Sequence, residues 1–398
     1  MYRQKRHTNG GSFFCDQELK RVLEFLGWLE VQANIRFEGS PHRANYEDLF
    51  YLATQLHDDL LDEYENPAIR PFILDAHARF GDPTHRTGGS VSQLSGLAEN
   101  ATNYIRDVVG VMLSKPPTRT DYLKLFLDIA NDNRVSELDL FTLNHDKLLE
   151  EYLASKIDII DGFEKENALG IRRWNPTLFN VLPLRESSAL CFFKHGGWRL
   201  WHPRRCRRNH IANVRLFKLH GSINWLSFRP EQPRQGEDDS NAWVEEYVGV
   251  RSNPSLSDAR DSRGRRHEAL RRPLISIGTF NKMIDYTDRV FFEMHYHLIR
   301  ALDDVERLIV CGYGFGDKGV NKRITEWMCS SLTRKILVID LKNPQSLEES
   351  ARRAIALKIH GWKQQGRWVH WSTGLDNPEI TWDRIAGELA LASAHERR

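Results

Sequence analysis

Five short apolar segments, each bounded by polar turns, constrain the fold of this chain more than any other feature. They have the length and composition of buried strands. They are 137–143 (ELDLFTL), 214–219 (VRLFKL), 273–277 (PLISI), 307–311 (RLIVC) and 335–339 (KILVI). Long helices are expected at about 287–305 and 319–332, between the last three of them. Strands that alternate with helices imply βαβ crossovers, so the sequence predicts an α/β fold with a doubly wound, mostly parallel sheet.

A helical segment and two insertions lengthen this pattern. Apolar residues at helical spacing dominate residues 45–134, and a further helix is expected at 16–32. The insertion at 161–213 is rich in Arg, Trp and Pro, whereas the insertion at 229–272 is polar and charged. We expect the second insertion to form a surface loop with one strand at 242–250.

These boundaries divide the chain into three parts. Residues 1–40 form an atypical N-terminus with no candidate strand, so the sheet is expected to lack its first strand. Residues 41–345 are expected to form one α/β domain that contains the helical segment and both insertions. Residues 346–398 are expected to form a C-terminal extension that packs on the core.

The composition of the 398 residues excludes several classes of protein. Lys and Arg number 56 and Asp and Glu 54, and a net charge of +2 argues against a protein built around phosphate-backbone binding. No apolar run approaches the roughly 20 residues that span a bilayer, and no signal peptide is recognisable. The five cysteines form no C-x-x-C pair, which argues against a secreted disulfide framework. A cytoplasmic protein without membrane association is therefore expected.

Polar and glycine-rich residues follow the predicted strands at their carboxyl ends. In an open parallel sheet, ligands bind outside these ends, near the point where the strand order reverses. The residues are Thr142, Asn144 and Asp146 after the first strand, His220 and Gly221 after the second, 312–317 (GYGFGD) after the fourth, and Asp340 after the last. A polar ligand such as a nucleotide is therefore expected at this edge of the sheet.

Three of these residues have the chemistry of a catalytic site. Asn144 and Asp146 are two apart, so in an extended segment their side chains project to the same side and suit a polar ring and its ribose. The alternative is an Asx-capped turn before a helix at 147–153. His220 ends an apolar strand and precedes a glycine, which suits a general base with a reference pKa of about 6.5. A structural histidine is the alternative there.

The run 311–324 (CGYGFGDKGVNKRI) places three glycines between a strand and a helix. Backbone N–H groups at such a turn suit a phosphate or ribose, although the spacing is not G-x-G-x-x-G. Asp317 is equally well placed to cap the helix. Asp340 suits ribose hydroxyls, and an ordinary acidic turn before Pro344 is the alternative.

Four segments, in this order and separation, resemble the sirtuin (silent information regulator) superfamily. They are 141–150 (FTLNHDKLLE), 218–225 (KLHGSINW), 309–317 (IVCGYGFGD) and 336–340 (ILVID). The segment 45–49 (NYEDL) is similar to one that is common in the bacterial branch. Within the superfamily the chain most resembles bacterial sirtuin-like proteins of antiphage defence, which consume NAD. The resemblance implies a Rossmann-like, sirtuin-type domain over 41–345 that binds NAD as its substrate.

The resemblance also implies roles for individual residues. Asn144 would contact the nicotinamide ribose and position the attacking water, Asp146 would bind the nicotinamide carboxamide, and His220 would be the catalytic base. The further residues implied to bind NAD are Thr142, Gly221, Gly312, Gly314, Phe315, Asp317 and Asp340. The reaction would break the C1′–N bond and release nicotinamide with ADP-ribose or a cyclic form of it.

The sequence departs from the superfamily in two places. Sirtuins begin with a strand and a G-A-G-x-S turn that holds the NAD pyrophosphate, whereas residues 8–12 (TNGGS) have glycines but no preceding strand. The two C-x-x-C pairs of the deacylating members are also absent, so no metal is expected. An unusual group of residues is the alternative zinc site: Cys191, His195, His202, Cys206 and His210.

Three functions are compatible with these observations. The first is an NAD glycohydrolase of antiphage defence that forms a homo-oligomer and works beside a co-encoded ATPase or sensor protein. The second is an NAD-dependent protein deacylase, which the missing zinc cysteines disfavour. The third is a module that senses NAD or ADP-ribose without turnover. Nucleic acid is not expected as substrate, because a solvated basic loop explains four arginines more simply: Arg204, Arg205, Arg207 and Arg208.

Overall fold

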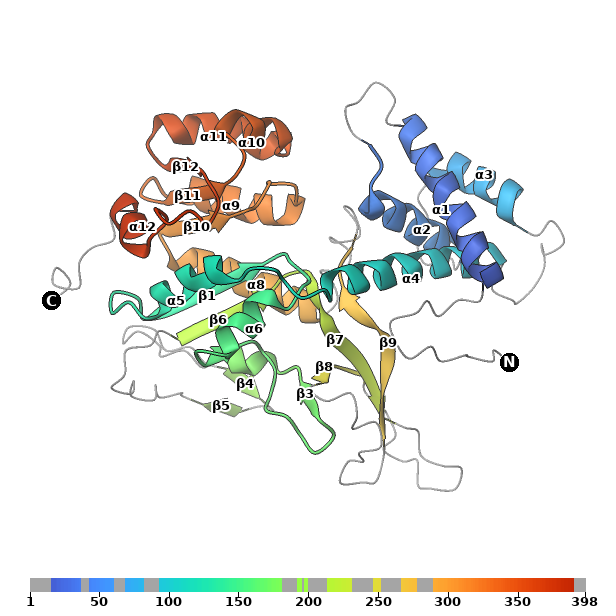
Figure 1. Cartoon of the computed structure of the whole chain (residues 1–398), viewed down its shortest axis with the longest axis horizontal. Coiled ribbons are helices and arrows are strands. Elements are labelled where there is room, and N and C mark those ends of the chain that lie inside the picture. Colours follow the sequence, from blue (N-terminus) through green and yellow to red (C-terminus); the bar gives the residue numbers. More distant parts are fainter. Residues whose placement is uncertain are drawn as a thin grey trace.

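The computed structural model is a mixed α/β structure with two parallel sheets, an antiparallel sheet and a helical segment (Figure 1). The coexistence of parallel strands and covering helices agrees with the alternation seen in the sequence. The residues that the structure describes are 16–36, 43–60, 69–81, 93–180, 192–194, 197–199, 213–230, 246–251, 266–277 and 289–389.

The first parallel sheet joins strands from the middle of the chain. β1 (Glu137–Thr142) pairs with β6 (Asn213–Lys218), and β6 pairs with the short strand β2 (Ile159–Ile160). Helix α6 (Leu148–Ala154) follows β1. The two strands expected from the apolar pattern in this part of the chain are confirmed, and their carboxyl ends lie next to each other.

The second parallel sheet has the order β10 (Arg307–Cys311), β11 (Lys335–Asp340) and β12 (Trp368–Ser372). Residues 336–339 of β11 are at most 1% exposed, as in a strand that is covered on both faces. β10 and β11 lie where the sequence predicted them. β12 was not expected as a strand, and it places part of the region 346–398 within the sheet.

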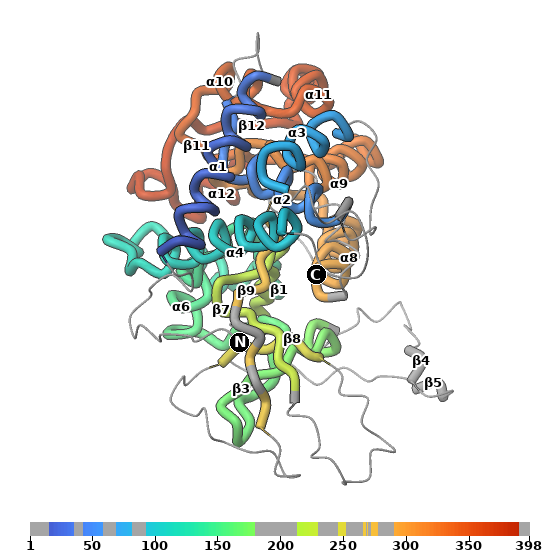
Figure 2. Tube along the Cα trace, turned by 90° about the vertical axis from the view of Figure 1, so that its right-hand side faces the viewer, coloured from blue at the N-terminus to red at the C-terminus, as the bar shows by residue number. Residues whose placement is uncertain are grey.

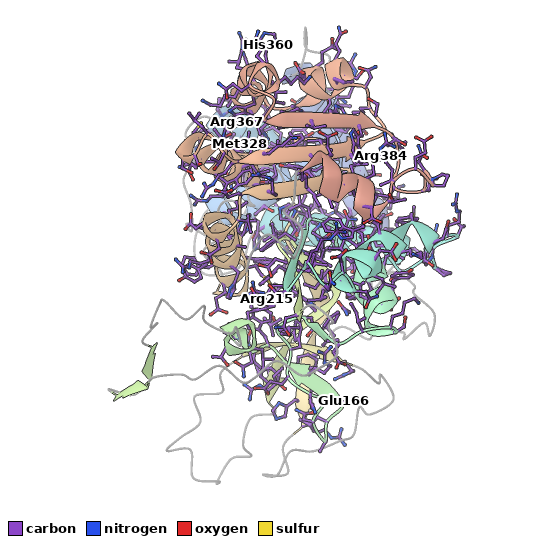
Figure 3. The ribbon with its side chains drawn as sticks, turned by 90° about the vertical axis from the view of Figure 1, so that its left-hand side faces the viewer. Glu166, Arg215, Met328, His360, Arg367 and Arg384 are labelled. Carbon is purple, nitrogen blue, oxygen red and sulfur yellow. The ribbon has the colours of Figure 1, made fainter. Side chains whose placement is uncertain are left out.

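Helices cover both faces of the second sheet. Ile336 and Val338 face one helical layer and Leu337 and Ile339 face the other, as the two-residue period of a strand requires. The first layer contains α8 (Arg289–Asp304), α9 (Lys318–Ser330), α10 (Pro344–Ser350) and α11 (Arg353–Gln364). The second contains α5 (Lys124–Ala130) and α12 (Trp382–Glu388). Figure 3 shows α12, which contains Arg384, in front of the three strands.

The two parallel sheets share a core without sharing a hydrogen bond. Among the described strands, β1 is an edge of the first sheet and β10 is an edge of the second. Leu138 of β1 and Ile309 of β10 nevertheless belong to the same apolar cluster on one face. Phe141 of β1 and Val310 of β10 belong to a common cluster on the other face.

The prediction that 273–277 is a third strand of the parallel sheet is wrong. These residues overlap β9 (His267–Ile275), which pairs antiparallel with β7 (Gly221–Pro230). A parallel partner requires a long, usually helical crossover, and the polar residues 229–272 have no helical periodicity to supply one. The antiparallel sheet has the order β3 (Ile171–Arg173), β8 (Tyr247–Arg251), β7 and β9. β8 overlaps the strand expected at 242–250.

The helical segment near the N-terminus forms a cluster of its own. Its helices are α1 (Asp16–Arg36), α2 (Tyr46–Leu60), α3 (Arg70–Phe80) and α4 (Gln93–Leu113). Phe25, Leu29 and Leu56 are fully buried among them, and Ile275 at the end of β9 joins the same cluster. Figure 2 shows α4 directly above β7 and β9. Within the described ranges, no helix is both long and apolar enough to cross a membrane.

Several sequence predictions lie outside the described residues. They include the glycines of 8–12, the candidate zinc ligands Cys191, His195, His202, Cys206 and His210, and the arginines Arg204, Arg205, Arg207 and Arg208. Of the insertion at 161–213, the structure describes residues 161–180, which contain β3, a hairpin of β4 (Phe192–Lys194) and β5 (Gly197–Arg199), and residue 213 at the start of β6.

Candidate functional site

A cavity of about 940 Å³ lies at the carboxyl ends of β1, β6 and β10. The loops after these strands supply polar side chains to it, among them Asn144, Asp146, His220 and Asp317. Most of the remaining lining comes from the start of α2 and the second half of α4, where Val108 and other apolar side chains predominate. A ligand in this cavity therefore meets ionisable groups on one wall and an apolar surface on another.

The loop after β1 forms a turn and also lines the cavity. The Thr142 hydroxyl accepts the N–H of Asn144 at 3.1 Å, and the Asp146 carboxylate accepts the N–H of Leu148 at 2.9 Å. Within the described part of the chain, the side-chain amide of Asn144 makes no hydrogen bond, so it is available to a ligand. The turn and the ligand-binding interpretations of these residues are therefore compatible.

A buried lysine fixes the position of this loop. The Lys218 ammonium donates to the backbone carbonyl of Asp146 and to Glu150 Oε2, the latter at 2.6 Å. Asn224 donates to the other oxygen of Glu150 at 3.2 Å. Burial raises the pKa of Glu150, and the charge of Lys218 opposes that rise. This polar network ties β6 and β7 to α6 and to the loop that precedes it.

His220 occupies the junction between β6 and β7. Its side chain is 3% exposed and lines the cavity. Gly221 has a φ of +76°, and a Cβ at this position would collide with the carbonyl oxygen of Leu274 in β9. The glycine is therefore required for the close approach of β9, and it acts through the backbone rather than as part of the cavity lining.

Asp317 connects His220 to the start of α9. One carboxylate oxygen lies 3.2 Å from His220 Nε2, and the other accepts the N–H of Val320 at 2.8 Å as the N-cap of the helix. Both side chains of the pair are at most 5% exposed. A carboxylate held in this way orients the imidazole and stabilises its protonated form.

Two further histidines surround this pair. The ring of His145, in the loop after β1, lies 6.1 Å from the ring of His220. Burial lowers the pKa of His295 on α8 to about 4, the charge of His220 acts in the same direction, and Asp317 opposes it. His295 is therefore neutral near pH 7.

The glycine run after β10 forms a tight turn. Gly312 has a φ of +61°, and its N–H donates to the carbonyl of Ile339 at 2.9 Å. Phe315 has a φ of +54°, and its fully buried ring packs against Tyr313 and Trp368. The side chain of Phe315 therefore belongs to the core, whereas Tyr313 contributes to the cavity lining.

The remaining predicted residues shape the surroundings of the cavity. The side chain of Asp340 accepts the N–H of Lys342 at 2.8 Å, as in an ordinary turn. Lys342 also lies beside Gly314, 3.8 Å from the position that a Cβ would take there. The cavity lining includes none of four predicted residues from these loops: Thr142, Gly312, Gly314 and Asp340.

Sequence reasoning missed several residues of the cavity. Arg352 lies between α10 and α11 and reaches the cavity beside Gly316. Tyr46 at the start of α2 and Met112 on α4 belong to the other wall. Tyr46 falls within the NYEDL segment, so the sequence contained one signal for that wall. Arg352 had none, because it follows a short helix and belongs to no motif.

In the part of the chain that the structure describes, no group of three or more His, Cys, Asp or Glu side chains is arranged so that it could hold a metal ion. Protein-family models give no match to this chain, and comparison with curated proteins gives none either. The function therefore has to be argued from the chemistry of the cavity.

Proposed function

We propose that this chain is an NAD glycohydrolase that cleaves NAD into nicotinamide and ADP-ribose or a cyclic form of it. The observation that supports this most strongly is the composition of one wall of the cavity. A buried His220–Asp317 pair and the side chains of Asn144 and Asp146 line the same cavity, although they come from three different strand ends. An imidazole, an amide and a carboxylate are the groups needed to activate water and to bind a ribose and a carboxamide.

The arrangement of the strands supports a nucleotide-binding fold. We propose that the two parallel sheets are the halves of a doubly wound, Rossmann-like sheet with the order 3-2-1-4-5-6. β6 and β1 would be positions 3 and 2, and β10, β11 and β12 would be positions 4, 5 and 6. Within the described residues, no strand occupies position 1, between β1 and β10. The cavity then lies at the switch point, where such sheets bind nucleotides.

The chemistry follows from the positions of the side chains. Asp146 holds the carboxamide of the nicotinamide, and the C1′–N bond breaks with its electron pair passing to the ring nitrogen. The Asn144 amide holds the ribose and the water, and the developing oxocarbenium ion is stabilised by the surrounding dipoles. Water adds to C1′ and gives its proton to His220, whose imidazolium is stabilised by Asp317.

The biological context of this proposal rests on the sirtuin resemblance. It comprises a role in bacterial defence against phage, a cytoplasmic homo-oligomer, and a co-encoded ATPase or sensor protein as partner. A strain that expresses the protein with its neighbouring genes should lose NAD after infection, and plaque formation should recover with His220→Ala.

The test of the reaction itself is an incubation of the purified protein with NAD, followed by mass spectrometry of the products. We expect nicotinamide and ADP-ribose or its cyclic form, with no requirement for an acylated peptide. Products that appear only with an acyl-lysine peptide would identify a deacylase instead. Stable NAD binding without any product would identify a sensor, and absence of both binding and products would refute the NAD site.

A further inference from the structure

Arg352 is fixed against the glycine turn at the edge of the cavity. Its backbone N–H donates to the carbonyl of Phe315 at 3.1 Å, and its Nε donates to the carbonyl of Gly316 at 2.6 Å. The first bond fixes the backbone of Arg352, and the second fixes one corner of its guanidinium. The residue lines the cavity together with Tyr313 and Asp317.

The rest of the guanidinium has no protein partner in the described part of the chain. Arginine has five N–H groups in a planar fork, and Arg352 uses one of them. No carboxylate of the described residues lies within 4.0 Å of it. Other arginines here form two-pronged bonds with carboxylates, as Arg215 does with Asp139 and Arg172 with Asp161. A fork that is held in place but not neutralised is a ready site for an anion.

The surroundings of Arg352 are also suited to an anion. Lys342 lies beside Gly314 and donates to the Ser350 hydroxyl at 3.0 Å, and no described carboxylate pairs with it. Asp317, the carboxylate closest to Arg352 along the turn, is directed to His220 and to the start of α9. The dipole of α9 offsets part of its negative charge, so it opposes an anion at Arg352 less than a carboxylate away from a helix start would.

We propose that Arg352 binds a phosphate group of the nucleotide in this cavity, with Lys342 adding to the positive charge. The inference rests on the proposed function and names the phosphate contact of that site. Arg352 supplies positive charge to the same cavity that His220 lines, at the carboxyl edge of the sheets. A planar fork suits two phosphate oxygens at once, which a lysine cannot match.

The first test measures the affinity for ADP-ribose and for adenosine by calorimetry. Arg352→Ala should weaken ADP-ribose binding about ten- to a hundredfold, the value of one or two charge-assisted hydrogen bonds, and leave adenosine binding unchanged. Arg352→Lys should recover part of the loss. Arg353→Ala is the matched control, because Arg353 is the next residue in the chain and its side chain is exposed on α11. An equal loss for both ligands, or no loss for ADP-ribose, would overturn the inference.

The second test separates this inference from the proposed function. Phenylglyoxal modifies free guanidinium groups, and inorganic pyrophosphate should protect Arg352 from it but not Arg353. If the wild-type protein binds no ADP-ribose and pyrophosphate still protects Arg352, the anion site stands and the NAD proposal fails. If pyrophosphate gives Arg352 no protection, the anion site is wrong, whatever the fate of NAD.

Discussion

The two parallel sheets contribute to the cavity in different ways. Two largely buried charge pairs hold the first sheet: Arg215 of β6 pairs with Asp139 of β1, and Lys218 of β6 pairs with Glu150 of α6. The β10–β11–β12 sheet is held mainly by apolar packing, with residues 336–339 almost fully buried between two helical layers. The first sheet supplies reactive side chains to the cavity, and the second supplies a glycine turn and Asp317.

The difference shows how each kind of contact fixes a different part of a site. A side chain such as Asp146 has to be held in a polar loop, where Lys218 can bond to its backbone. A backbone turn such as 312–316 needs only rigid strands beneath it, and close packing supplies them. The stability of the first sheet should therefore depend on side-chain charge and on pH, and the stability of the second on the volume of its buried side chains.

The largest effect should come from breaking the buried pair beneath the Asp146 loop. Lys218→Met leaves Glu150 buried without its counter-charge, so we expect a loss of about 3–5 kcal/mol in the free energy of unfolding, measured with urea. The double variant Lys218→Met/Glu150→Leu should recover much of the lost free energy of unfolding, because no buried charge is left without a partner. Lys147→Met is the control, because its pair with Glu151 is exposed and should cost less than about 1 kcal/mol. Equal losses of the free energy of unfolding in Lys218→Met and Lys147→Met would contradict the view that buried charge pairs hold the first sheet.

Removing volume from the second sheet should be the next largest effect. Leu337 is fully buried, and Leu337→Ala should lower the free energy of unfolding by about 3 kcal/mol through the cavity it creates. The loss should be the same in low and high salt. Leu341→Ala, at a position 80% exposed, should change little. A strong salt dependence of the Leu337 variant would show that charge also holds this sheet.

Acid should act through the histidines of α8 that lie against the first sheet. Burial lowers the pKa of both His295 and His297 to about 4, and Arg215 acts in the same direction on His297. The unfolded chain therefore binds more protons than the folded chain between about pH 6.5 and 4, so stability falls as the pH falls through this window. At pH 4.5 we expect each histidine to lower the free energy of unfolding by about 2 kcal/mol relative to neutral pH. In urea titrations of His297→Phe, the part of this loss that comes from His297 should disappear. If the free energy of unfolding of that variant depends on pH as in the wild-type protein, His297 does not cause the loss of stability in acid.

The smallest change in stability should separate the two roles of Asp317. Asp317→Asn keeps an oxygen that can cap α9, so the free energy of unfolding should change by less than about 1 kcal/mol. Nicotinamide release should nevertheless fall about tenfold or more, because the imidazolium of His220 loses its counter-charge. Asn343→Ala removes the cap of α10 and should cost about 1 kcal/mol without affecting the reaction. Normal activity in Asp317→Asn would mean that its carboxylate serves only the helix.

The sequence predicted the parts of the fold that depend on local pattern. The strands β10 and β11 contain continuous apolar runs, and β1 is a short, largely apolar segment. The polar residues at their ends pointed to the site because parallel strands share a carboxyl edge. The direction of β9 could not be predicted in this way, since the same apolar run suits a parallel or an antiparallel partner. β12 (WVHWS) was missed because a histidine and a serine interrupt its apolar pattern.

The candidate site was predictable only where a side chain follows a strand. Asn144, Asp146 and His220 satisfy that rule, and they line the cavity. Arg352 reaches the cavity through bonds to the carbonyls of Phe315 and Gly316, which are contacts between segments distant in the sequence. No local pattern encodes such contacts, and the same holds for the apolar wall from α4.

The most direct test of the proposed reaction is the rate of nicotinamide release from NAD by the wild-type protein and by His220→Ala. His360→Ala provides the control, because His360 is exposed on α11 and bonds only to Gln364 among the residues described. We expect steady release by the wild-type protein and by the control, and a loss of at least a hundredfold in His220→Ala. Release that continues unchanged in His220→Ala would contradict the assignment of the cavity as the site of NAD cleavage.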